Sequence, residues 1–156
     1  MTPVSLKEIK SELGALEPDL LINLCLHLAK YKRENKELLT YLLFNAHDEN
    51  EYIRGVKVIM DEGFDSMNLS NVYLAKKTLR KVLRIANKFI KYSGLKKTEV
   101  ELLIYFCKKL KATGIAMPEG TVIANMYVRQ VQKIKKSLAT LHEDLQFDYS
   151  EEIELL

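Results

Sequence analysis

The sequence predicts an all-α protein of about seven helices, and three observations support this. Apolar residues recur at steps of three and four almost throughout, no stretch alternates with the period of two typical of a strand, and the chain has only six glycines and three prolines. With 47% hydrophobic and 29% charged residues among 156, the chain is long enough to bury one core. We therefore expect a single all-helical domain over residues 1–145 and an acidic C-terminal tail over residues 146–156.

Capping residues mark where the helices begin and end. Ser5 and Glu8 have the spacing of a capping box and open a first helix, which Gly14 ends. Pro18 suits the first position of a second helix, which runs to Tyr31. The other expected boundary residues are Asp48, Ser70, Gly94, Thr98, Gly114 and Pro118. The remaining expected helices span residues 38–46, 48–67, 71–92, 98–114 and 118–145.

An internal comparison places the junction between the second and third helices, which contains neither Gly nor Pro. Residues 30–41 and 91–105 share the pattern Lys-Tyr followed by Glu-Leu-Leu-x-Tyr. Gly94 interrupts the later copy between these two elements, so we expect a turn after Tyr31 as well. Chance similarity between two leucine-rich amphipathic helices is the alternative explanation.

If the two copies correspond, the chain consists of two three-helix units, residues 18–67 and 71–145. Such units bury their apolar faces by stacking on each other, which favours an α/α superhelix-like arrangement. In outline this is similar to an armadillo or HEAT repeat, although the chain carries no family signature. Two copies are fewer than a free-standing array usually needs, so a compact helical bundle is the alternative.

Charge is distributed unevenly along the chain, although the net charge is only +3. Residues 66–142 contain 16 Lys and Arg but only 3 Asp and Glu, whereas the segments on either side are net acidic. On the helix expected at residues 71–92, the basic residues fall within an arc of about 140°, opposite the apolar side. We call these residues the basic stripe: Lys76, Lys77, Arg80, Lys81, Arg84, Lys88 and Lys91.

The basic stripe leads to the functional hypothesis. Like charges on one helix face repel, and an acidic partner would relieve that repulsion. We predict a non-catalytic protein-interaction module that presents this surface to an acidic protein; the protein's own acidic tail or N-terminal half would be an intramolecular partner. The main alternative is binding of a nucleic-acid backbone through the same helix. The structural alternative is a solvated helix face without a partner.

No motif indicates catalysis, a cofactor or a metal site. The histidines His27, His47 and His142 lack the spacing of metal ligands, and His27 is expected at the boundary of the core. Cys25 and Cys107 lie in separate apolar segments, so we expect two buried, reduced thiols. A small enzyme whose catalytic groups converge from distant helices is the third hypothesis, and it has no candidate residues.

The apolar segments predict a cytoplasmic protein that does not bind membranes. The longest of them, residues 20–29, is too short to cross a bilayer, and the charged N-terminus does not resemble a secretory signal. The helix expected at residues 119–145 carries a narrow apolar seam. This seam either packs on the protein's own core or forms a homodimer. Its residues are Tyr127, Val131, Ile134, Leu138, Leu141 and Leu145.

Overall fold

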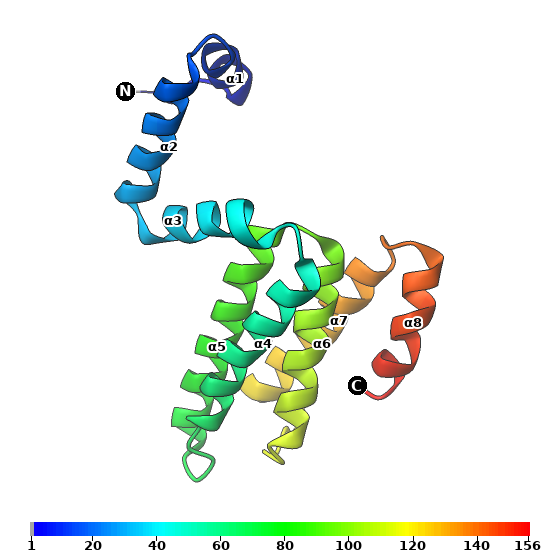
Figure 1. Ribbon diagram of the computed structural model, residues 1–156. Helices are drawn as coiled ribbons and strands as arrows, with labels where there is room; N and C mark the ends of the chain where they lie inside the picture. The colour runs from blue at the N-terminus through cyan, green and yellow to red at the C-terminus, as the bar shows by residue number, and fades with distance from the viewer. Residues whose placement is uncertain (1) are drawn as a thin grey trace. The chain divides into compact units, whose positions relative to one another are not determined.

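The computed structural model describes residues 2–156, which form helices and connecting turns without any strand (Figure 1). The chain divides into two compact units, of which the first ends at Phe44 and the second runs from Asn45 to Leu156. The first unit contains α1 (Leu6–Gly14), α2 (Pro18–Tyr31), α3 (Arg33–Thr40) and most of the π-helical turn η1 (Tyr41–Asn45). The second unit contains α4 (Glu49–Asp65), α5 (Val72–Ser93), α6 (Lys96–Ala112), α7 (Val122–Leu138) and α8 (Glu143–Glu154).

Several of the expected helix-end signals are confirmed, including Pro18 as the first residue of α2. Ser5 and Glu8 form both hydrogen bonds of the capping box: the Glu8 amide donates to Ser5 Oγ at 3.3 Å, and the Ser5 amide donates to Glu8 Oε2 at 2.9 Å. The Asp48 carboxylate accepts from the Glu51 amide at 2.9 Å and so caps α4. Gly94 ends α5 with a φ of +69°, a left-handed conformation that favours glycine.

The turn expected after Tyr31 is also present. α2 ends at Tyr31, Lys32 is extended with φ −141° and ψ 144°, and α3 begins at the next residue. The Asn35 side chain bridges the turn, because its Nδ2 donates to the Leu28 carbonyl at 2.8 Å. The duplication itself stays a prediction. The division between the two units falls inside its first expected copy, residues 18–67.

Two expected starts, those of α5 and α6, are wrong by one or two residues, and the third helix, expected at residues 38–46, begins five residues earlier as α3. Thr98 does not cap α6, which begins at Lys96; Thr98 lies inside the helix, is fully buried and donates to the Glu49 carboxylate. The N-cap of α5 is Asn71, whose Oδ1 accepts from the Leu74 amide at 3.1 Å, rather than Ser70.

The last expected helix, residues 118–145, is two helices in the structure. Thr121 caps α7 by accepting from the Ala124 amide at 3.3 Å, so the helix begins four residues later than expected. α7 ends at Leu138, and His142 Nδ1 then accepts from the Asp144 amide at 3.3 Å to cap α8. The chain therefore has eight α-helices within residues 2–156, and most of the expected tail belongs to α8.

α6 is the central helix of the second unit (Figure 1). It packs against α4, α5 and α7, and its apolar residues surround the helix rather than forming one stripe. The apolar side chains of α6 that are at most 3% exposed are Val100, Leu102, Leu103, Ile104, Phe106, Cys107 and Leu110. The expected seam of α7 is used within the same unit, since Ile134 is fully buried and its other residues are half-buried.

Candidate functional site

One apolar flank holds α5 in the second unit. Its buried residues follow the helical period: Ala75, Leu79, Val82, Ala86 and Ile90. Gly63 of α4 allows a close approach to this flank, because a Cβ at that position would lie 2.5 Å from Cγ2 of Val82. The basic stripe occupies the opposite flank of α5, so the packing that buries the apolar residues directs the cations outward.

Most of the basic stripe is exposed. Lys77, Arg80, Lys81, Arg84 and Lys91 are exposed, and Lys76 is half-buried. Within residues 2–156 none of these six side chains forms an ion pair. They repel one another at i,i+3 and i,i+4 spacing without compensation inside the helix, because no acidic residue occurs between Ser66 and Thr98.

Lys88 differs from the other cations of the stripe. Its side chain is half-buried, and its Nζ lies 4.9 Å from the centroid of the Phe89 ring and 6.0 Å from that of Tyr92. An ammonium group at this distance from aromatic faces is attracted by their negative charge density. Lys88 therefore also stabilises the folded unit, unlike the exposed members of the stripe.

The acidic C-terminal segment, which we considered as a partner of the stripe, contacts other helices. Lys108 of α6 pairs with Glu152 at 2.6 Å, and Lys111 Nζ donates to the Leu155 carbonyl at 2.9 Å. The Tyr149 hydroxyl of α8 donates to Glu101 at 2.7 Å. In the described part of the chain, α8 thus lies against α6 and α7. The C-terminal segment leaves the exposed cations of α5 uncovered.

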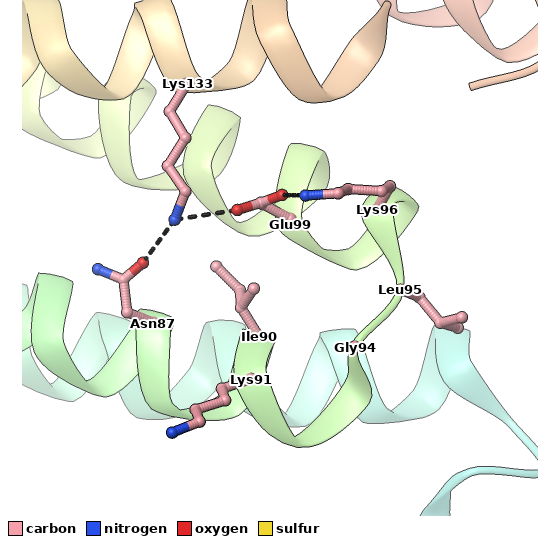
Figure 2. A pocket seen from close by; sticks show the side chains of 8 residues that line it. All are labelled: Asn87, Ile90, Lys91, Gly94, Leu95, Lys96, Glu99 and Lys133. Carbon is pink, nitrogen blue, oxygen red and sulfur yellow. Dashed lines mark hydrogen bonds and ion pairs between the residues drawn. The ribbon is translucent and has the colours of Figure 1, made fainter. Parts of the chain in front are cut away.

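A hollow of about 330 Å³ lies beside the C-terminal end of the stripe, where α5, the start of α6 and α7 meet (Figure 2). Lys133 of α7 reaches into it and pairs with Glu99 at 2.9 Å, and its Nζ also donates to Asn87 Oδ1 at 3.1 Å. Lys96 binds the other oxygen of Glu99 at 2.8 Å. Figure 2 shows the Lys91 ammonium pointing away from this cluster, toward the stripe face.

Glu99 is the most strongly perturbed acid of the site. Burial raises its pKa, but hydrogen bonds from Lys96, Ser137 and Lys133 outweigh this and lower the pKa from 4.5 to about 2. The Ser137 hydroxyl donates at 2.6 Å, and the Glu99 side chain is only 8% exposed. The carboxylate thus stays charged and neutralises the two lysines that face it, which makes this cluster a connection between helices.

Sequence analysis missed Lys96 and Lys133 as neighbours of the stripe. Both line the hollow together with Lys91, although they belong to α6 and α7. The only available signal was the excess of basic residues over 66–142, which does not indicate which helices lie side by side. The basic surface of the second unit therefore extends past α5, with Glu99 inserted between its parts.

The two cysteines differ in burial, and His27 is exposed. Burial raises the pKa of the Cys107 thiol to about 12, the opposite of what activates a cysteine. Cys25 and His27 were expected to be buried or at the boundary of the core, but both are exposed because α2 has no helix covering them in the first unit. Among residues 2–156, no group of three or more His, Cys, Asp or Glu side chains is placed to bind a metal ion.

Two general findings complete the description of the site. No helix within residues 2–156 combines the length and the apolarity needed to span a bilayer. No family model matches the chain, and no curated protein and no solved structure is significantly similar to it.

Proposed function

We propose that this protein is a cytoplasmic, non-catalytic interaction module that binds an acidic protein surface through the basic stripe of α5. The observation that carries the proposal is the row of cations on one helix face: five of them are exposed, and these five and the half-buried Lys76 form no ion pair within residues 2–156. An acidic partner would offset the mutual repulsion of these cations and would form ion pairs with them. Lys76 and Lys91 are fifteen residues apart, so the stripe is about 22 Å long.

Tyr73 favours a protein as the partner. Its side chain is 70% exposed, and its position, four residues before Lys77, places it on the stripe face of α5. Tyrosine and arginine are enriched among the residues that anchor protein interfaces, and Arg80 and Arg84 lie about two and three turns beyond Tyr73 on the same face. A nucleic-acid backbone would use the cations without needing this aromatic ring.

The test compares polyanions of different chemistry. Fluorescence anisotropy with labelled poly-glutamate, duplex DNA and single-stranded RNA at low and physiological salt measures binding of the full chain. We expect salt-dependent binding of poly-glutamate that Arg80→Glu with Arg84→Glu weakens roughly tenfold or more, without loss of helical content. Lys7→Glu with Lys10→Glu is the matched control, because it changes the net charge equally on α1.

Three outcomes would overturn the proposal. If the wild type binds duplex DNA or RNA but not poly-glutamate, the nucleic-acid alternative replaces it. If no polyanion binds at low salt, or if the α1 control weakens binding as much as the α5 variant, the stripe is a solvated face.

A further inference from the structure

α2 has the composition of a buried helix but lies exposed in the first unit. No charged residue occurs between Asp19 and Lys30. None of its residues is buried, and several large apolar side chains are 43% to 58% exposed: Leu20, Ile22, Leu24, Leu26 and Leu28. A helix that is apolar on all sides normally lies inside a protein, and an exposed apolar surface of this extent marks an interaction site.

One face of α2 carries the spacing of a helix–helix seam. Leu21, Leu24, Leu28 and Tyr31 follow one another at steps of three, four and three, the spacing of the apolar seam in coiled coils. Tyr31 is 73% exposed, and Leu28 also lines a hollow of about 240 Å³ beside α3. Figure 1 shows α3 leaving α2 at its C-terminal end, and Leu24, nearer the start of the seam, is 43% exposed.

The charges at the ends of α2 are complementary to each other. Glu17 and Asp19 lie at its start, and Lys30 and Lys32 lie at its end. Within residues 2–156 none of these four side chains forms an ion pair. Two copies of this helix placed antiparallel would bring an acidic end beside a basic end twice, whereas a parallel pair would bring like charges together.

We propose that α2 packs antiparallel against α2 of a second copy of this chain, forming a two-fold symmetric dimer. The seam is symmetric about Leu26: the antiparallel register places Leu24 opposite Leu28 of the other copy, and Leu21 opposite Tyr31. Glu17, four residues before Leu21, lies on the seam side of α2, and in this register it lies about 4.5 Å, along the helix axis, from the level of Lys32 in the second copy. Two copies of α2 thus match each other both in their apolar residues and in their charges. We therefore infer that a second copy of the chain occupies the exposed face of α2.

Sedimentation of the full chain tests the proposal first. We expect a species of twice the 18.0 kDa chain mass, and Leu24→Asp with Leu28→Asp should weaken its self-association by roughly a hundredfold or more. The matched control is Ile22→Asp with Leu26→Asp, which places the same two charges on the other side of α2. This control should leave the dimer largely intact, because these residues lie outside the seam.

Reversal of the end charges is the second test, and it does not introduce charge into the apolar seam. Glu17→Lys should weaken the dimer, as should Lys32→Glu, and the combination of the two should restore it. Acids at the start and bases at the end of a helix also complement its dipole, so the combined variant disfavours the isolated helix. Recovery of the dimer can then come only from pairing between copies.

Several results would overturn this inference. They are a monomeric wild type, a dimer that survives the seam variant, a control variant that dissociates as much as the seam variant, and a combined charge reversal without recovery. The variants that dissociate the dimer should bind poly-glutamate as tightly as the wild type does, because their substitutions lie in the first unit and α5 lies in the second. The experiments can therefore disprove the dimer without disproving the proposed function, and the reverse.

Discussion

The pattern Glu-Leu-Leu-x-Tyr occurs twice in this protein, and the two copies have different surroundings. At residues 37–41 it spans α3 and the first residue of η1, and at residues 101–105 it lies in α6. Leu38 is 36% exposed, whereas Leu102, the corresponding residue of α6, is fully buried. The pattern determines a helix in both places, but burial depends on whether neighbouring helices cover it.

The polar residues of the pattern differ in the same way. Arg33 Nε, four residues earlier on α3, donates to Glu37 at 3.0 Å, a contact within one helix. Glu101 accepts from the Tyr149 hydroxyl of α8 and pairs with Lys57 of α4 at 3.4 Å. The same glutamate therefore makes a local ion pair in the first unit and joins three helices in the second.

The largest expected effect comes from the matched leucines. Leu102→Ala should lower the free energy of unfolding by about 2–5 kcal/mol, because it leaves a cavity in the core of the second unit. Leu38→Ala should cost less than about 1 kcal/mol, since solvent already reaches the side chain. Urea unfolding followed by far-UV circular dichroism measures both. Equal losses would show that α3 is packed as tightly as α6 and would remove the contrast.

The second effect is a dependence of stability on pH that originates in the buried network of the second unit. The pKa of Glu99 is about 2 in the folded protein, below the ordinary 4.5. The carboxylate therefore stabilises the fold fully above about pH 4.5, and this stabilisation is lost as the pH falls toward 2. At neutral pH it amounts to at most about 3 kcal/mol.

Glu99→Gln tests this pH dependence. The variant should be less stable than the wild type at pH 7, and the difference should shrink as the pH is lowered toward 3. Glu34→Gln on the exposed side of α3 is the control and should change little at either pH. A constant difference between the wild type and Glu99→Gln from pH 7 to pH 3 would contradict the assigned ion pairs with Lys96 and Lys133.

The third effect compares crowded and open positions on one helix. Gly63→Ala should destabilise the second unit by about 1–2 kcal/mol, because the added methyl would meet the buried Val82 at 2.5 Å. Gly55→Ala on the same helix meets no atom within 4 Å and should stabilise it by up to about 1 kcal/mol, through helix propensity. Thermal unfolding of both variants measures the difference. Stabilisation by Gly63→Ala would show that α4 and α5 have room to separate.

Much of the helical architecture was predictable because its signals are local. The capping box of Ser5 and Glu8, the Asp48 cap and the left-handed Gly94 depend only on residues within one turn. Thr98 shows where this fails: it has the spacing of a capping residue, but a hydrogen bond to Glu49, which is distant in sequence, places it inside α6. The continuation of the chain as α8 was missed for a different reason: its cap is local, but it is the unusual capping residue His142.

The candidate site was predictable only in part. The amphipathic period of α5 indicated its apolar flank and the residues of the basic stripe, and the structure exposes most of them. The half-buried position of Lys88 against Phe89 and the approach of Lys133 from α7 involve side-chain packing and helix neighbours that no local pattern encodes. Their roles became apparent only from the tertiary contacts.

The sequence by itself determined that the chain is helical, where α1, α2 and α4 begin and which flank of α5 is basic. These properties depend on backbone capping and on the helical period, which act over a few residues. Only the tertiary structure decided that α6 buries nine of its residues while α2, the more apolar helix, buries none. Burial requires partners from distant parts of the chain, and α2 finds none within the first unit, where we infer that a second copy supplies one.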